Sequence, residues 1–360
     1  MVVQHLEHSL QKICRVGRAA GVQVILVLPG SNLRDFAPFR SDFSQQGFAG
    51  SLKVTELLRQ AEQLQQQKQP EQAWALLQQA VAADPRYAES AWRAGVAAAE
   101  LGHCEKALQL FRQARDEDIC PLRATQPILD AITRVSQQEQ VPLVDFAAIL
   151  DANGLQKRGC AVPGDEGFLD HVHPTIDMHR DLAVALGQQL QQLQLVAADV
   201  DFPQRARQIE PAILATLDAP RQAVGLITVA QVLSWAGKNT EALKLAEQAE
   251  QLDPQNVEVL SQLGRLYEKA GRLPDARRIL EQAVALGPDN PWALYRLARL
   301  HMRDSQWSTA LELLERSRQH TTTAQPSAFR AVLFRSLSQC CEQLGDLEKA
   351  SVYAATAASQ

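Results

Sequence analysis

The sequence predicts a mainly α-helical protein with a smaller α/β part. Small residues recur every 34 residues along much of the chain, which is typical of stacked helix pairs that form an α-solenoid. Two short apolar runs, at 22–28 and 141–146, each follow a helical stretch and indicate buried parallel strands. Helical repeats lie between these two runs and again after them. We therefore expect an α/β part interrupted by helices, followed by a wholly helical part.

Composition and charge exclude several classes of protein. The 360 residues are 46% hydrophobic and 21% charged, as in ordinary folded soluble proteins. The formal charge of −5 and the lack of a Lys/Arg run argue against a nucleic-acid partner. The longest apolar run, Val24 to Leu28, is far too short to span a bilayer, and no signal-peptide core precedes it. We therefore expect a cytoplasmic protein without a membrane span.

The 6 cysteines show no CxxC spacing and no dense framework of the kind found in small secreted domains. Reduced thiols are therefore expected, with Cys14, Cys104 and Cys160 packed as small apolar groups. Cys340-Cys341 lie in a predicted helix, where one of the two faces inward.

Alanines show the repeat most clearly. Ala73 and Ala107 are 34 residues apart, and so are Ala242 and Ala276. The eighth position of every unit is small, which lets the two helices of one unit approach closely. Each unit is therefore expected to be a pair of antiparallel helices. The eighth residues are Ala61, Gly95, Ala230, Gly264, Ala298 and, after an insertion near Pro326, Ser338.

The units resemble the tetratricopeptide repeat (TPR). The residues that carry this resemblance in the clearest unit are Leu263, Gly264, Tyr267, Ala276, Leu280, Ala283 and Pro288. The resemblance covers two units at 54–121 and four units at 223–360, with a linker at 196–222. Four units can form a solenoid by themselves. Two units are marginal, so the first pair should dock on another part of the chain.

The TPR resemblance implies a protein or peptide partner, held in a groove that the first helix of each unit lines. Arg265 and Arg299 stand where TPR domains that clamp a chaperone terminus carry Asn, which argues against a chaperone clamp. Arginines and aromatic rings would suit an acidic peptide instead. The alternative is a solvated helix face. The expected groove residues are Ser261, Arg265, Glu268, Lys269, Trp292, Tyr295, Arg299 and Arg303.

The two predicted strands need helices on both faces, because both are apolar throughout. Val22 to Leu28 stops at Pro29-Gly30, where the chain must turn. Val141 to Phe146 follows a predicted helix at Pro127 to Glu139.

Three further segments follow in a recognisable order. The first strand is followed by the loop Ser31 to Asp35 (SNLRD), then come the first two TPR units, the segment Cys120 to Arg123 (CPLR), the second strand, and Phe168 to Pro174 (FLDHVHP). In this order they resemble the later part of an SGNH (GDSL-type) hydrolase that contains TPR units. The resemblance spans 1–53 and 122–195. It implies a truncated, flavodoxin-like three-layer α/β domain.

The D-x-x-H-P block of that family matches Asp170, His173 and Pro174. The resemblance implies that His173 takes a proton from a serine hydroxyl, while Asp170 orients the imidazole and stabilises its cation. The reaction would be hydrolysis or transfer of an ester or acyl group. Asn32 and Arg34 would contribute to substrate binding.

The nucleophile and oxyanion blocks of the family have no match before Val22. Gly30-Ser31-Asn32 stands at the later loop of the family and not at its nucleophile turn. We favour a missing upstream portion, through a misplaced start or a split gene. The alternatives are a degenerate enzyme held up by its TPR units and a chain completed by a partner. A sheet reduced to its last two strands would expose apolar edges that favour association.

Other interpretations of the histidine segment remain open. His171, His173 and His179 could form a metal site with nearby carboxylates, although no helical i, i+4 histidine pair occurs. Asp170 could simply cap the following helix, with His173 a satisfied polar residue. Cys120 or Cys160 could act as a nucleophile with His173, without local sequence support.

We expect no metal or cofactor. The function is either an SGNH-like hydrolase that lacks its serine or a non-catalytic TPR scaffold, and the isolated chain should hydrolyse no activated ester.

Overall fold

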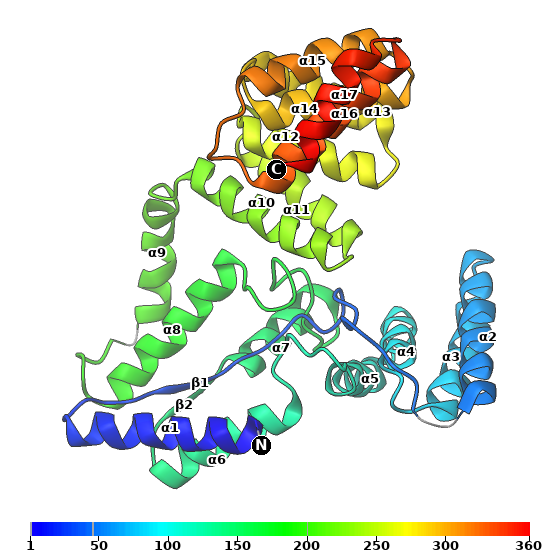
Figure 1. Cartoon of the computed structure of the whole chain (residues 1–360). Helices are drawn as coiled ribbons and strands as arrows, with labels where there is room; N and C mark the ends of the chain where they lie inside the picture. The colour runs from blue at the N-terminus through cyan, green and yellow to red at the C-terminus, as the bar shows by residue number, and fades with distance from the viewer. Residues whose placement is uncertain (1, 45–46, 200) are drawn as a thin grey trace. The chain divides into compact units, whose positions relative to one another are not determined.

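The computed structural model describes residues 2–44, 47–199 and 201–360. They form helices α1 to α17 and two short strands, so the protein is mostly helical (Figure 1). The chain divides into two compact units, Met1–Ala212 and Ile213–Gln360. None of the described helices is both long and apolar enough to cross a lipid bilayer.

The first unit contains a parallel two-stranded sheet. β1 (Leu26–Leu28) pairs with β2 (Leu143–Asp145), and Leu26 lies opposite Leu143. Both predicted strands are therefore present, although each is shorter than its apolar run. The predicted run at 22–28 begins before β1, and its first residue, Val22, is exposed.

Helices cover both faces of this sheet. Successive side chains of a strand point to opposite faces, so Leu26 packs with Cys14 and Val135 while Val27 packs with Phe146. The arrangement has three layers, with only two strands in the part of the chain that is described. The helices are α1 (Val2–Ala19) and α6 (Gln126–Glu139) on one face, and α7 (Phe146–Arg158) and α8 (Ile176–Gln192) on the other (Figure 1).

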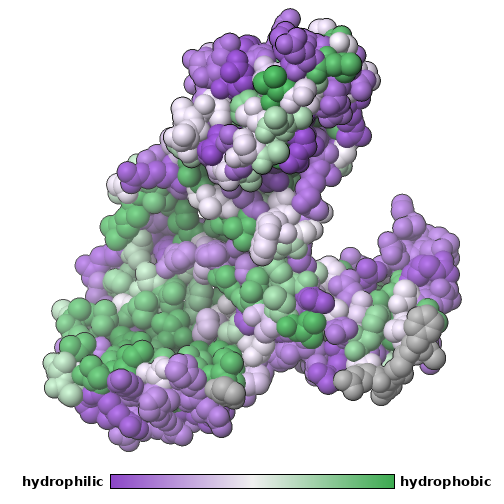
Figure 2. Space-filling view, viewed as in Figure 1, coloured by the Kyte–Doolittle hydropathy of each residue, from purple (hydrophilic) through white to green (hydrophobic). Residues whose placement is uncertain are grey.

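The outer edge of β1 has no partner strand among the described residues. Figure 2 shows a broad apolar surface over β1 and the adjoining sides of α1 and α8. Ile13 and Val16 of α1 are exposed, and so is Val22 before β1. The sequence predicts this apolar surface for a two-stranded sheet, and the structure confirms it. Such a surface favours association with another polypeptide.

Two helix pairs lie between β1 and α6 in the chain. Their core includes Leu33 and Val162, which come from loops of the α/β part, so the pairs dock on that part as expected. Trp92 strengthens the contact, because its indole N–H donates to the Arg34 carbonyl at 3.1 Å. The helices are α2 (Gly47–Gln66), α3 (Pro70–Ala83), α4 (Ala88–Glu100) and α5 (Cys104–Asp116).

A disulfide joins Cys104 to Cys160, with 5.2 Å between their Cα atoms. It ties the start of α5 to the segment that follows α7. The expectation that these two cysteines are reduced is therefore wrong. The sequence hides the pairing because 56 residues separate the two cysteines, and the fold brings them together. Disulfides persist mainly in oxidising compartments, so this pair gives no support to a cytoplasmic location.

The second unit is built of four helix pairs. The first helices of successive pairs contact one another and form one face of the unit. The preceding segment at 196–222 includes α9 (Phe202–Leu214). The pairs are α10 (Ala219–Trp235) with α11 (Asn239–Leu252), α12 (Val257–Lys269) with α13 (Leu273–Leu286), α14 (Pro291–Arg303) with α15 (Trp307–Gln319), and α16 (Ser327–Gln343) with α17 (Leu347–Ala358).

At Gly95 and Gly264, the small eighth residue packs against the second helix of the same unit. A Cβ placed on Gly264 would lie 2.5 Å from Cγ of Leu280. A Cβ placed on Gly95 would lie 2.9 Å from the ring of Phe111. These distances are too short for a side chain, which explains the predicted small residues.

Candidate functional site

The loop that enters α8 holds the predicted catalytic pair. Phe168 and Pro174 form an antiparallel bridge, and the backbone N–H of Leu169 donates to the His173 carbonyl at 2.8 Å. The Thr175 side chain then caps α8. The loop is therefore a closed turn that fixes the backbone on both sides of His173.

Asp170 and His173 are in direct contact. Nδ1 of His173 lies 2.7 Å from Oδ2 of Asp170. The backbone N–H groups of Val172 and His173 both donate to Oδ1 of Asp170 at 2.8 Å. The Asp170 side chain is 2% exposed, whereas that of His173 is 64% exposed. A buried carboxylate thus holds an exposed imidazole by one nitrogen and leaves Nε2 facing outward.

The charge of Asp170 is stabilised in place. Burial by itself would raise the pKa of this carboxyl, but the donated N–H groups of His173 and Val172 outweigh burial and lower it. Asp170 is therefore ionised at neutral pH and favours the tautomer with a proton on Nδ1 of His173. Among the described residues, no serine, threonine or cysteine side chain hydrogen-bonds to His173. The geometry provides a base without a nucleophile.

Asn32 and Arg34 lie in a polar network inside the first unit. Nδ2 of Asn32 donates to Oδ1 of Asp165 at 3.0 Å, and the N–H of Asp35 donates to Oδ1 of Asn32 at 2.9 Å. Arg34 pairs with Asp35 and Glu166. Asn32 is fully buried, which argues against the predicted contact between Asn32 and a substrate. These residues fasten the loop after β1 to the loop before α8.

The two other histidines near this loop, His171 and His179, contact different groups. His171 packs between the rings of Phe36 and Phe39, at centroid distances of 5.0 and 5.3 Å. Nδ1 of His179 lies 3.0 Å from the Thr175 carbonyl oxygen. No group of three His, Cys, Asp or Glu side chains that could hold a metal ion occurs among the residues described.

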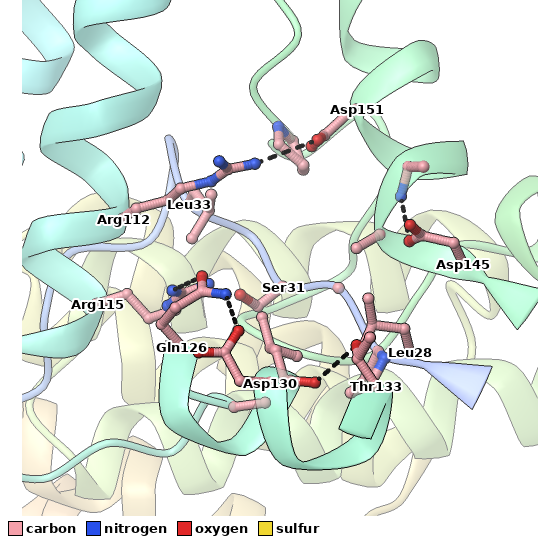
Figure 3. Close-up of a pocket in the computed structure, with 17 residues that line it drawn as sticks. Leu28, Ser31, Leu33, Arg112, Arg115, Gln126, Asp130, Thr133, Asp145 and Asp151 are labelled. Atoms are coloured by element: carbon pink, nitrogen blue, oxygen red, sulfur yellow. Dashed lines mark hydrogen bonds and ion pairs between the residues drawn. The ribbon is translucent and has the colours of Figure 1, made fainter. Parts of the chain in front are cut away.

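A separate cavity of about 200 Å³ lies at the carboxyl ends of β1 and β2 (Figure 3). Its walls come from α5, from the first turns of α6 and α7, and from the loop after β1. Neither Asp170 nor His173 lines it, so Ser31 and the predicted base face different spaces. The polar residues that line it are Ser31, Arg112, Arg115, Gln126, Asp130, Thr133, Asp145 and Asp151.

Asp151 has the most perturbed carboxyl group in this cavity. Burial, together with the charge of Asp145, raises its pKa to about 6, although Arg112 lies 3.6 Å away. Sequence reasoning missed this site, because α5 and α7 are brought together only by the fold. One feature of the sequence could have indicated the cavity: polar residues follow the carboxyl ends of both predicted parallel strands, where such sheets bind ligands.

Three of the predicted groove residues make polar contacts on α12 and α14. Nζ of Lys269 donates to the Ser234 carbonyl at 2.8 Å. Arg299 pairs with Glu268 at 3.0 Å. Nε of Arg265 donates to Gln262 at 3.1 Å, and this side chain forms no ion pair among the described residues, although the charge of Glu268 acts on it.

The aromatic part of the predicted groove is covered from within the chain. Phe329 of α16 stacks on Trp292, with 3.8 Å between ring centroids, and meets Tyr295 edge to face. Tyr295 is consequently buried. Phe329 lies in the first turn of α16, directly after the insertion near Pro326. Arg303 lines a different cavity, next to the start of α13.

Arg296 was not predicted, although it is the most buried cation of this face. It is 5% exposed, it donates to the Ser261 hydroxyl, and its guanidinium carbon lies 5.3 Å from the Trp292 ring centroid. Burial lowers its pKa to about 10. It forms no ion pair with a carboxylate among the described residues. Arg296 lies between two predicted groove residues of α14, Tyr295 and Arg299, and nothing in the repeat pattern marked it as a binding residue.

Comparisons with solved structures find low-identity similarities. The crystal structure of MamA is 17% identical, with a TM-score of 0.33, and the match covers 46% of this chain and 95% of that chain. The Sgt2 TPR domain from Aspergillus fumigatus is 19% identical, with a TM-score of 0.31, over 35% of this chain and 82% of that chain. The first TPR of Spaghetti (RPAP3), bound to the HSP90 peptide SRMEEVD, is 18% identical, with a TM-score of 0.31. This match covers 36% of this chain and 97% of that chain.

Models of the tetratricopeptide repeat match residues 58–121, 236–285 and 269–333. No curated protein matches the sequence. These matches give no evidence for a hydrolase. The chain contains tetratricopeptide repeats in both of its units, as its 34-residue period predicts.

Proposed function

We propose that the second unit is a scaffold that binds an acidic peptide segment on the face formed by α12 and α14. Arg296 carries this proposal, because it is a buried guanidinium that forms no ion pair in the described chain, and the charges of Glu258 and Glu268 act on it only from a distance. Burying an unpaired charge costs free energy, which a carboxylate supplied by a ligand would offset. Helical repeat arrays present extended surfaces of this kind to protein ligands.

The charge balance of this face supports an acidic ligand. Arg265, Arg296 and Arg299 project from two neighbouring helices. Glu268 forms an ion pair with Arg299 and its charge also acts on the other two arginines, while Glu258 acts on Arg296, so the arginines still outnumber the carboxylates. Burial lowers the pKa of Arg265, which bonds to the neutral Gln262. Each guanidinium keeps N–H donors that match the two oxygens of a carboxylate.

The test is the binding of a fluorescent peptide rich in Asp and Glu, measured by anisotropy with the full chain. Arg265→Gln and Arg299→Gln should each weaken binding about tenfold, because a charge-assisted contact is lost. Arg318→Gln, on the second helix of its pair, is the matched control and should bind normally. Affinity should also fall as salt is added. An absence of binding, or an equal loss in the control, would contradict the proposal.

The Asp170–His173 pair favours a second function. We propose that it is the base end of an SGNH-like ester or acyl hydrolase whose serine is supplied by another polypeptide segment. The 2.7 Å contact and the exposed imidazole suit a general base. The unpaired edge of β1 offers a place for an added strand. Asn32 and Arg34 would then position the loop beside that strand.

The purified chain should not hydrolyse nitrophenyl acetate, because no described nucleophile contacts His173. Turnover by the isolated chain that is lost in His173→Ala would show that the nucleophile lies within it, against this prediction. Turnover by the complex isolated from source cells, with the same loss, would support a supplied serine. His179→Ala, a histidine on α8 outside the pair, is the control.

A further inference from the structure

We propose that the cavity at the carboxyl ends of β1 and β2 binds a small anion, a carboxylate or a phosphate group, through Arg112 and Ser31. This site is independent of both functions proposed above. It lies in the first unit, whereas α12 and α14 belong to the second, and Asp170 and His173 do not line it.

Ser31 supplies the first observation. The residue is 7% exposed and lines the cavity, and its hydroxyl points into the space in Figure 3. Within the described part of the chain, this hydroxyl forms no hydrogen bond. A hydroxyl group that faces a cavity and bonds to no protein group is free to bond to a ligand.

The two arginines of the cavity differ in what they offer. Nε of Arg115 donates to Asp116 at 2.8 Å, and its Nη2 donates to Gln126 at 3.1 Å, so this side chain is committed. The Arg112 side chain is 47% exposed and meets only Asp151, at 3.6 Å, which is longer than a hydrogen bond. Its guanidinium therefore keeps N–H donors for an anion.

The helices around the cavity add positive potential. The first turns of α6 and α7 both line it, and helix N-termini attract anions, although Asp116 already accepts the N–H of Gln126 and Asp145 that of Ala148. Two of the carboxylates in the lining are already engaged. Asp145 accepts the N–H of Ala148 at 2.9 Å, and Asp130 accepts from Gln126 at 2.8 Å. Ligands of parallel sheets also bind at the carboxyl ends of the strands.

Asp151 should couple binding to pH. The charged groups that share the cavity with it are Arg112 and Arg115 of α5, Asp130 of α6 and Asp145 at the end of β2. Burial raises the pKa of Asp151 to about 6, so above this pH its charge holds Arg112 and repels an anion. Below this pH Asp151 is neutral and releases Arg112. Anion binding therefore takes up one proton and should weaken up to about tenfold per pH unit above 6.

The experiment is calorimetric titration of the full chain with inorganic phosphate, acetate and methylammonium at pH 5.5 and 7.5. We expect phosphate or acetate to bind, more tightly at pH 5.5, and methylammonium not to bind. The stronger of the two anions identifies the group that the site prefers. Arg112→Gln should abolish binding, and Ser31→Ala should weaken it about tenfold.

Asp151→Asn should remove the pH dependence while binding persists. Arg59→Gln, an exposed arginine on α2, is the control and should leave binding unchanged. Three results would overturn the proposal: neither anion binds at pH 5.5, binding is unaffected by both Arg112→Gln and Ser31→Ala, or methylammonium binds better than the anions.

Discussion

Arg296 illustrates, at the scale of one residue, how a binding group can lower stability. Burial lowers its pKa to about 10, which means that the folded state holds this proton less firmly than the unfolded chain does. The charged side chain therefore costs stability at neutral pH, and the cost is relieved only as the pH rises above about 10. Ser261 supplies a neutral hydrogen bond, which offsets only part of this cost.

Replacing the buried Arg296–Ser261 pair by apolar groups should stabilise the protein. In Ser261→Ala/Arg296→Met, both the buried charge and its hydroxyl partner are removed, so the free energy of unfolding should rise by about 1 kcal/mol. Binding of the acidic peptide should weaken at the same time. Thermal unfolding and peptide anisotropy measure the two effects. Arg318→Met, at an exposed arginine outside the proposed binding face, is the control. A fall in stability would show that Arg296 is held mainly for the fold.

At the scale of the element, the repeat period predicts each helix pair of the second unit because the small eighth residue has a direct steric cause. Gly264 leaves room for Leu280, which packs between the two helices. Contacts between distant helices could not be predicted, since they depend on the three-dimensional path of the chain. The sequence located the insertion near Pro326, but not that it brings Phe329 onto Trp292. It also gave no sign of the buried Arg296.

Two glycine substitutions separate packing from helix propensity. Gly264→Ala should lower the free energy of unfolding by about 1–3 kcal/mol, because its Cβ would clash with Leu280. Gly225→Ala should raise it by up to about 1 kcal/mol, since a Cβ at this helical position meets nothing within 4 Å and Ala favours the helix. Chemical denaturation compares the two. Equal effects would contradict the packing explanation.

At the scale of the whole molecule, the structure combines a small α/β part with two sets of TPR units. The order of strand, helix pairs and strand could be predicted, because apolar runs and small-residue periods are visible in the sequence. The pairing of Cys104 with Cys160, and the cavity between α5 and α7, could not. Both arise where the first helix pairs dock on the α/β part.

The disulfide predicts a thiol count and a stability difference. The denatured, unreduced chain should react with a thiol reagent at four cysteines, namely Cys14, Cys120, Cys340 and Cys341. Cys104→Ser should lower the stability of the first unit by about 2–4 kcal/mol, because the unfolded chain gains freedom. Mass spectrometry after alkylation and thermal unfolding measure the two effects. Six reactive thiols in protein purified without reductant would contradict the pairing.

Hydrogen exchange of the full chain, with and without an Asp- and Glu-rich peptide, tests the central claim most directly. The proposed scaffold function predicts slower exchange in α12 and α14, and the loss of that protection in Arg265→Gln. Protection confined to other helices, or none at a peptide concentration that saturates binding, would contradict an acidic-peptide site on this face.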